Sequence, residues 1–416
     1  MVEQFLQKHY QSTNNIDTNK MVQLAMAEMR QGLQNHGSTI PMIPTYLQNI
    51  GRDKIKPGKR LVIDAGGTNF RSAVGYFDEN GNVQIEGLQK TKMPASDELL
   101  TKQQFYDKIA SNVAYLLDDC TDVGFCFSYQ VDMQSNMDGK VAVFSKEVKA
   151  PEVVGTFVGA ETLSAIKKHS DIERKIVILN DTVATLLGGM ALSSKQYSAY
   201  VGYIFGTGTN LCYIEDTQNI TKVKGLPQGK MLVNTEMGGC SCFTQGDFDK
   251  IVANKTADPA KQHFEKMSSG KYLADIIHQA FSFGASEGLF DDNLTLCPFE
   301  LKDISAFLTG EQNFVYNIFA CDSDREKARE ICLNLIDRSA KMGAILNASA
   351  ILMSCQDKSL PVAIVAEGTT FNKLPTFRAN FEKYLAQIFA PHGITFEILQ
   401  GQELNLVGTL MATMAL

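Results

Sequence analysis

The chain has 416 residues, a length that exceeds one hydrophobic core and predicts about two domains. Its 39 basic and 46 acidic residues give a net charge of −7, which argues against nucleic acid or an anionic membrane as the main partner. The longest uncharged run, residues 196–214, is as long as a membrane span, but its glycines and polar residues exclude it as one.

The cysteines and the first residues predict a cytoplasmic protein. Residues 1–4 contain neither a basic region nor an apolar stretch, so no signal peptide is expected. The nine cysteines follow no disulfide spacing, and several lie in apolar strand or helix contexts, as reduced thiols do. Cys240 and Cys242 form a close pair, but no second cysteine or histidine pair lies nearby in the sequence, so zinc is not expected there.

Hydrophobic periodicity predicts strands and helices in alternation. An amphipathic helix over 18–35 comes first, and a loop that contains Pro41, Pro44 and residues 51–58 follows it. Strands are predicted at 61–63, 70–76, 123–128, 140–144, 175–179 and 361–366, and helices at 97–117, 159–170, 182–192, 268–281, 325–353 and 406–416. Such a succession, with a hairpin turn at residues 80–81, is typical of an α/β fold with mixed sheets.

One carboxylate marks the end of the first predicted strand. Asp64 lies there, and Gly66 and Gly67 follow, which lets the backbone turn sharply and approach a ligand. Backbone N–H groups in such a turn form an anion-binding nest, and a carboxylate beside it can hold hydrated Mg²⁺. An ordinary hairpin with a structural aspartate would show the same pattern, so other stretches have to decide.

A weak internal repeat favours two related domains. Residues 63–69 align without gaps on residues 204–210, and both copies end an apolar strand and share Gly-Thr-Asn. Two such turns, one in each half, predict two domains that face each other across a cleft. A third Gly/Thr turn follows a buried strand at residues 367–370.

A second carboxylate ends another buried strand. Asp181 lies between Asn180 and Thr182, where open α/β folds bind ligands. It could accept the proton of a substrate hydroxyl as that oxygen attacks a phosphate. The alternative is a helix N-cap, for which Asn and Asp are favoured residues.

Taken in order, these stretches resemble the motifs of the hexokinase/glucokinase family, in its eukaryotic type. The matches are collinear from about residue 40 to residue 410. Residues 64–71 and 205–210 resemble its two phosphate motifs, 365–369 its adenosine motif, 179–183 its catalytic stretch, 124–128, 234–238 and 264–273 its sugar-binding segments, and 42–46 the segment after its first helix.

The resemblance implies an α/β, actin-like (ribonuclease H-like) two-domain ATPase fold, with mixed sheets flanked by helices and a central cleft. The small domain would comprise residues 59–180 with the C-terminal helix, about 404–416, and the large domain residues 1–58 and 181–403. The implied activity is transfer of the γ-phosphoryl group of ATP, with Mg²⁺, to the 6-hydroxyl of glucose or a related hexose. We expect a monomer or homodimer without nucleic-acid or membrane partners.

The resemblance also assigns roles to individual residues. Asp181 would be the general base, and Asp64 would hold Mg²⁺, through water. The sugar would be bound by Ser128, Ser145, Lys146, Asn180, Asn210, Glu236 and Glu265. The nucleotide and its phosphates would be bound by Asp64, Gly66, Gly67, Thr68, Asn69, Arg71, Gly206, Thr207, Gly208, Gly368 and Thr369.

The chain departs from the family pattern in four places. Gln130 stands where the family has proline, and the segment 145–148 has lost a glycine, which bears on sugar selectivity. Glu367 replaces an aspartate, and Gly408 with Thr409 keeps only part of a glycine-rich turn, which bears on nucleotide affinity.

Three other functions compete with the kinase. A sugar sensor would keep the fold and lose turnover, but Asp64, Asp181 and the phosphate glycines are all present. The bacterial repressor/kinase group would show a zinc-binding Cys-x-Cys-Gly-x-x-Gly-Cys motif and a neighbouring histidine, and neither occurs around Cys240. An actin- or chaperone-like ATPase with a protein partner leaves Asn180, Glu236 and Glu265 without a role.

Overall fold

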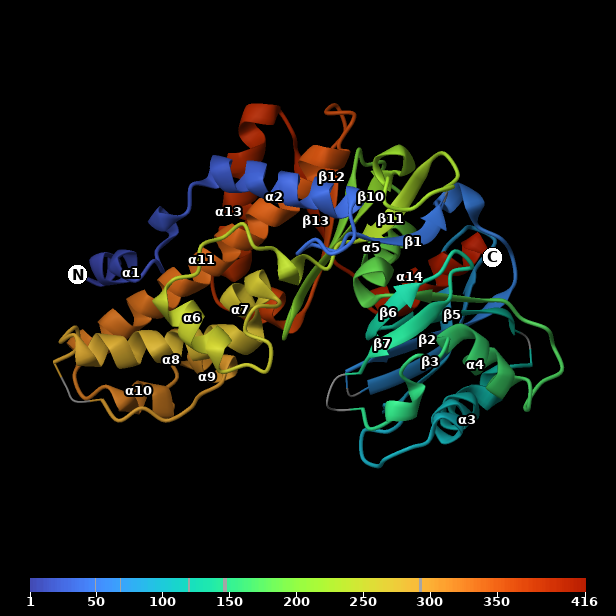
Figure 1. Cartoon of the computed structure of the whole chain (residues 1–416), viewed down its shortest axis with the longest axis horizontal. Coiled ribbons are helices and arrows are strands. Elements are labelled where there is room, and N and C mark those ends of the chain that lie inside the picture. The colour runs from blue at the N-terminus through green and yellow to red at the C-terminus, as the bar shows by residue number, and fades with distance from the viewer. Residues whose placement is uncertain (49, 68, 119, 145–147, 292–293) are drawn as a thin grey trace.

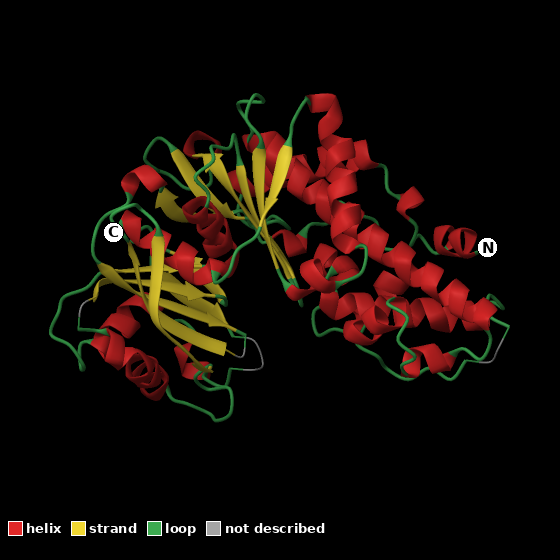
Figure 2. Ribbon diagram, turned by 180° about the vertical axis from the view of Figure 1, so that it is seen from behind, coloured by secondary structure: helices red, strands yellow, loops and turns green. Residues whose placement is uncertain are grey.

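The computed structural model describes residues 1–48, 50–67, 69–118, 120–144, 148–291 and 294–416 (Figure 1). They form two lobes, each built on one sheet, and the C-terminus lies where the lobes meet, far from the N-terminus (Figures 1 and 2). Among these residues, no helix combines the length and apolarity that crossing a bilayer requires.

The sheet of the first lobe has five strands. Its order is β4 (Val83–Lys92), β3 (Asn69–Phe77), β2 (Lys59–Gly66), β5 (Cys120–Phe127) and β8 (Ile176–Leu179). The first three form an antiparallel meander, and β5 and β8 run parallel to β2. The helices α3 (Lys102–Val113) and α4 (Val158–Ile166) pack on one face, and β6 (Gln130–Met133) pairs with β7 (Gly139–Val143) as a separate hairpin.

The second sheet repeats this arrangement. Its order is β1 (Ile43–Gln48), β11 (Lys230–Asn234), β10 (Thr209–Asp216), β9 (Tyr200–Phe205), β12 (Val362–Glu367) and β13 (Phe396–Leu399). Apart from β1, its strands correspond in order to β4, β3, β2, β5 and β8 of the first sheet. The strands β11, β10 and β9 are antiparallel, and β12 and β13 run parallel to β9. The predicted repeat is therefore confirmed, because the described residues of 63–69 join β2 to β3 as residues 204–210 join β9 to β10.

Two helices lie between the sheets, α5 (Asp181–Leu192) and α14 (Leu404–Ala412). They cross so closely that a Cβ on Gly408 would lie 1.8 Å from the Ala184 carbonyl oxygen, and one on Gly188 would lie 2.4 Å from that of Leu404. Gly124 of β5 meets Thr409 of α14 in the same way, at 2.5 Å. The glycines let α5 and α14 bring the two sheets together around one apolar layer.

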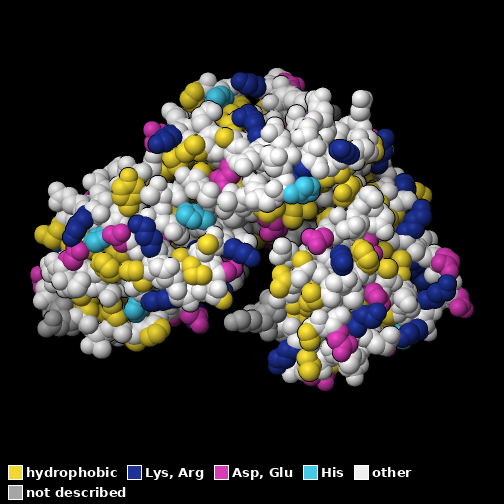
Figure 3. Space-filling model, in the orientation of Figure 1, with side chains coloured by type: hydrophobic (Ala, Val, Ile, Leu, Met, Phe, Trp, Pro, Cys, Tyr) yellow, Lys and Arg dark blue, Asp and Glu magenta, His cyan; other side chains and the backbone are white. Residues whose placement is uncertain are grey.

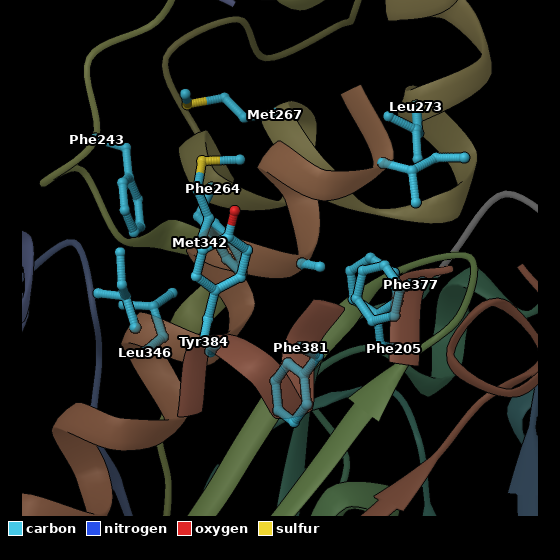
Figure 4. Packing of buried hydrophobic residues seen from close by; sticks show 14 of the residues in the cluster. Phe205, Phe243, Phe264, Met267, Leu273, Met342, Leu346, Phe377, Phe381 and Tyr384 are labelled. Atoms are coloured by element: carbon cyan, nitrogen blue, oxygen red, sulfur yellow. The ribbon is translucent and has the colours of Figure 1, made fainter. Parts of the chain in front are cut away.

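The second lobe carries most of the helices (Figure 2). They are α1 (Val2–Lys8), α2 (Thr18–Gln34), α6 (Asp247–Asn254), α7 (His263–Ser268), α8 (Gly270–Ser286), α9 (Leu301–Leu308), α10 (Phe314–Ile318), α11 (Asp322–Ser354), α12 (Thr369–Lys373) and α13 (Phe377–Phe389). Phe205, the last residue of β9, stacks on Phe377 with ring centroids 4.2 Å apart (Figure 4). This stack anchors the turn that follows β9.

The structure corrects one local prediction and adds elements that were not predicted. Residues 43–48 form β1, although Pro44 and the neighbouring Pro41 pointed to a loop; β1 is an edge strand, where proline is tolerated. Residues 130–133 form β6, which was not predicted. Gly408 and Thr409 lie inside α14 rather than in a glycine-rich turn. The division into domains at residues 58 and 180, with the C-terminal helix assigned to the small domain, stays our proposal.

We predict that Gly408→Ala destabilises the protein, although alanine favours helix over glycine by about 1 kcal/mol. The new methyl group would meet backbone atoms of α5, so one helix has to move, at a cost of about 1–3 kcal/mol net. Urea unfolding measures this change, with Gln387→Ala on the exposed face of α13 as the control. Equal stability of Gly408→Ala and wild type would show that the crossing is not tight.

Candidate functional site

Two adjoining cavities lie between the lobes, where Figure 3 shows an opening. The first, which we name the inner pocket, has a volume of about 300 Å³ and is lined by polar residues that include Ser128, Asn180, Asp181, Thr209, Asn210, Asn234, Glu236 and Glu265. The second, the elbow cavity, has about 410 Å³ and is lined by Asp64, Gly66, Gly67, Asn69, Arg71, Lys90, Ser128, Asp181 and Asn405. Ser128 and Asp181 line both cavities, so the two meet at these side chains.

Asp181 is the first residue of α5, directly after β8. Asn180 is the N-cap, and its side chain accepts a hydrogen bond of 2.9 Å from the Thr182 amide. The same amide donates to Asp181 Oδ1 at 2.8 Å, which orients the carboxylate. Burial, followed by the nearby charges of Asp64 and Glu236, raises the pKa of Asp181 to about 7. Asn180 is therefore the N-cap, and its neighbour Asp181 stays the candidate base.

A cluster of amide and carboxylate side chains also lines the inner pocket. The Asn210 Nδ2 group donates to Asn234 Oδ1 at 2.8 Å and to Glu236 Oε1 at 3.0 Å, and Asn234 Nδ2 donates to the same Glu236 oxygen at 2.8 Å. Glu236 itself has a left-handed backbone, with φ of 55°. Such a conformation is rare for a non-glycine residue and occurs most often at functional sites. Burial raises the pKa of Glu236.

Glu265 reaches the same pocket from α7. Its Oε2 accepts a hydrogen bond of 3.1 Å from the Thr209 amide, at the start of β10. A Cβ on Gly208 would lie 2.7 Å from that oxygen, so a side chain there would displace the Glu265 carboxylate. Burial raises the pKa of Glu265 as well. The turn after β9 thus connects the second predicted phosphate motif to a predicted sugar ligand.

Asp64 lies at the end of β2 and faces the elbow cavity. Its Oδ2 accepts hydrogen bonds from Nε and Nη2 of Arg71, and Arg71 Nη1 also contacts Glu403 at 2.5 Å. Asp64 Oδ1 is buried and finds no hydrogen-bond partner among the described residues. A buried carboxylate oxygen without a partner, at the wall of a polar cavity, fits a hydrated Mg²⁺ ion.

The turn after β9 also meets the predicted adenosine motif. Gly368 has φ of 125°, and a Cβ there would lie 2.2 Å from the Phe205 carbonyl oxygen. The Gly206 oxygen accepts a hydrogen bond of 3.1 Å from the Thr370 hydroxyl. Thr207 and Thr369 are exposed beside this contact. Gly206, Thr207, Gly368 and Thr369 therefore lie near one another, on the second lobe, but line neither cavity.

Three predicted site residues, Thr68, Ser145 and Lys146, lie outside the described residues. The remaining predicted sugar ligands and the predicted base all line the inner pocket. The assignments of individual roles stay predictions.

Sequence reasoning missed several residues of the site. Asn234 lines the inner pocket two residues before Glu236, and its place at the end of an apolar strand was a usable signal. Tyr129 donates a hydrogen bond of 2.9 Å to the Gly67 carbonyl oxygen and so connects the sugar-site strand to the first phosphate turn. Lys90 and Asn405 carried no motif signal, because they reach the elbow cavity only through the pairing of β3 with β4 and the return of α14. The same return brings Glu403 to Arg71.

Comparison with known proteins agrees with this geometry. The human protein Hexokinase-1 is 29% identical over 406 residues, which cover 89% of this chain and 43% of that protein. Hexokinase-1 of Nicotiana tabacum is 29% identical over 366 residues, 80% of this chain and 73% of its own. The chain thus spans less than half the length of the animal relatives it matches.

A hexokinase from Schistosoma mansoni, solved in complex with glucose, superposes with a TM-score of 0.79 at 22% identity and covers 99% of this chain and 100% of its own. The likeness confirms the predicted actin-like fold with its mixed sheets. Two family models described as Hexokinase match residues 1–191 and 200–415. This chain belongs to the hexokinase family.

Proposed function

We propose that this protein transfers the γ-phosphoryl group of ATP to the 6-hydroxyl of a hexose, glucose foremost. The observation that carries the proposal is the meeting of the two cavities at Asp181 and Ser128. A sugar in the inner pocket and a phosphate chain in the elbow cavity would approach each other at Asp181, the carboxylate that lines both cavities. Holding both reactants at that point supplies most of the rate in phosphoryl transfer.

The lining of the inner pocket supports a sugar substrate. Asn210, Asn234 and Glu236 are already hydrogen-bonded to one another, so their donors and acceptors are held in fixed directions. A sugar presents several hydroxyls, each of which donates and accepts, and amides and carboxylates match them. A site of this kind rejects an analogue that lacks one hydroxyl, because a buried polar group is then left without its partner.

Asp181 would act as the general base. Its Oδ1 is held by Thr182, and Oδ2 has no hydrogen-bond partner among the described residues. The carboxylate takes the proton of the 6-hydroxyl as that oxygen forms its bond to the γ-phosphorus. The bond from this phosphorus to the β–γ bridging oxygen breaks, and ADP leaves.

The nucleotide would bind across the two phosphate turns. Asp64 and the glycines at 66 and 67 face the elbow cavity, and residues 206–208 approach residues 368–370 on the other lobe. Mg²⁺ held at Asp64, when bound, would neutralise part of the charge of the phosphates. Arg71 keeps the Asp64 carboxylate oriented, and Glu403 balances the charge of Arg71.

The test is ADP formation by the purified protein with Mg²⁺, against glucose, mannose, fructose, N-acetylglucosamine and no sugar. Strong glucose-dependent ADP formation is the expected result. Binding of glucose by calorimetry without sugar-dependent turnover would instead identify a sugar sensor. ATP hydrolysis that no sugar changes would identify an ATPase of another class.

Replacement of Asp181 by alanine separates binding from chemistry. We expect glucose affinity to stay within several-fold, because Asn210, Glu236 and Glu265 remain, while kcat falls by about 10² or more. Calorimetry and a coupled ADP assay measure the two quantities. Asp275→Ala, on the exposed face of α8, is the control and should change neither. Near-normal kcat in Asp181→Ala would remove this residue from the role of base.

The activity should also depend on pH through Asp181. Because the ionised carboxylate accepts the proton and its pKa is about 7, kcat/KM should fall as the pH drops below that value, about tenfold per pH unit. The charge of Glu236 contributes to the raised pKa, so Glu236→Gln should move the midpoint to lower pH. Glu382→Gln, a glutamate on α13 away from the cavities, should leave it in place. An unmoved midpoint in Glu236→Gln would contradict the assignment.

A further inference from the structure

One group of side chains outside the two cavities has the chemistry of a metal-ion site. The sulfur atoms of Cys240 and Cys242 lie 3.3 Å apart, and Cys240 Sγ lies 3.4 Å from Glu28 Oε2. One ligand atom from each of the three residues lies within 4.8 Å of the others. Glu28 belongs to α2 and precedes Cys240 by 212 residues, so only the fold brings the third ligand to the cysteine pair.

The spacing suits a tetrahedral ion. Bonds of about 2.3 Å to sulfur and about 2.0 Å to oxygen place two sulfur ligands about 3.8 Å apart and a sulfur and an oxygen about 3.5 Å apart. The distance from Cys240 Sγ to Glu28 Oε2 already fits, and the two sulfurs have to separate by only about 0.5 Å. A rotation of the half-buried Cys242 side chain can supply that shift.

The glutamate is held in place by its own partners. Glu28 Oε1 accepts hydrogen bonds from the Ser241 amide at 3.0 Å, from the Ser241 hydroxyl at 2.8 Å and from the Thr39 hydroxyl. The Ser241 amide also reaches Oε2, at the longer distance of 3.3 Å. Outer partners of this kind orient a carboxylate ligand and are typical of metal sites.

The charge around the group also favours a cation. Cys240 is fully buried, Glu28 and Cys242 are half-buried, and among the described residues no lysine or arginine forms an ion pair with Glu28. The other comparable group, formed by Asp291, Cys321 and Asp324, differs in this respect. There Lys327 Nζ lies 2.9 Å from Asp324 and 3.5 Å from Asp291. A lysine therefore supplies the positive charge in that group, whereas no described lysine or arginine pairs with Glu28.

We propose that Cys240, Cys242 and Glu28 bind one divalent cation of the zinc class, with water as the fourth ligand. Each thiol loses its proton as its sulfur binds the ion, so one ion bound releases two protons from the cysteines. No bond between the sulfurs forms, and no electron is transferred.

The site would stabilise the turn that carries Glu236. The Gly239 amide donates to the Glu236 carbonyl oxygen at 3.2 Å, and the Cys240 amide donates to that of Met237 at 2.9 Å. An ion bound at Cys240 would tie this turn to α2 and help to hold Glu236 in its left-handed conformation. This second role rests on the proposed function, because it matters only if Glu236 binds the sugar. The binding of the ion does not rest on it.

The experiment uses the full chain, stripped of metal by a chelator and kept reduced by a phosphine. Zn²⁺ affinity is measured by competition with a chromophoric chelator, and Co²⁺ reports thiolate ligands by its sulfur-to-cobalt charge-transfer absorption. We expect one ion per chain and two protons released. Cys240→Ser and Cys242→Ser should each weaken Zn²⁺ binding by at least about a hundredfold, and Glu28→Gln by at least about tenfold. Cys297→Ser, an exposed cysteine, and Cys321→Ser, in the other group, should bind as wild type does.

Two results would overturn the site. One is Co²⁺ binding without charge-transfer absorption, or with absorption that Cys240→Ser and Cys242→Ser leave unchanged. The other is a Cys240–Cys242 disulfide that forms in place of zinc binding when Zn²⁺ is present. Glu28→Gln keeps both cysteines and so gives an answer even if a serine variant fails to fold. None of these readouts needs kinase activity, so failure here is distinguishable from failure of the proposed function.

Discussion

The close crossing of α5 and α14 is the contact on which the rest of this structure depends. Gly188 and Gly408 let the backbones of the two helices come into direct contact. Both sheets then pack on this pair of helices. Because α5 begins at Asp181, the crossing also sets the position of the candidate base. The same contact places Glu403 and Asn405, at the start of α14, beside the elbow cavity. The packing of α5 on α14 thereby determines where these side chains lie around the two cavities.

A second constraint is the gathering of acidic side chains around one opening. Asp64, Asp181, Glu236 and Glu265 come from four different elements and face two adjoining cavities. Each accepts a hydrogen bond from an amide, a guanidinium or a backbone N–H group, which orients it toward the cavities. Burial in this arrangement raises the pKa of Asp181, Glu236 and Glu265, which costs stability and, under the proposed function, prepares the site for a polar substrate and a cation. Stability is thus given up for function at this point of the fold.

Much of the site was predictable because its motifs are local. Three motifs each combine a strand end, a tight turn and a polar side chain within a few residues. They are Asp64 with its glycines, Asp181 with Asn180, and the turn at 206–208. Backbone geometry then requires those residue types at those places. The repeat of Gly-Thr-Asn favoured two related halves for the same reason. Tyr129 and Asn405 were missed, because a contact across distant segments leaves no pattern in the neighbouring residues.

By itself, the sequence determined the fold class, the two equivalent turns and most of the polar residues that line the inner pocket. The strands and turns follow from the alternation of apolar residues and the placement of glycine, which are local properties that a single chain displays. Most of the polar pocket residues followed from the resemblance to the motifs of a known family. Only the tertiary structure decided that Pro44 belongs to an edge strand, that Gly408 lies at a helix crossing, and that Glu28 approaches Cys240 and Cys242. These outcomes depend on which surfaces pack together. Packing brings together residues that are far apart in the sequence, and nothing in the local sequence indicates such a contact.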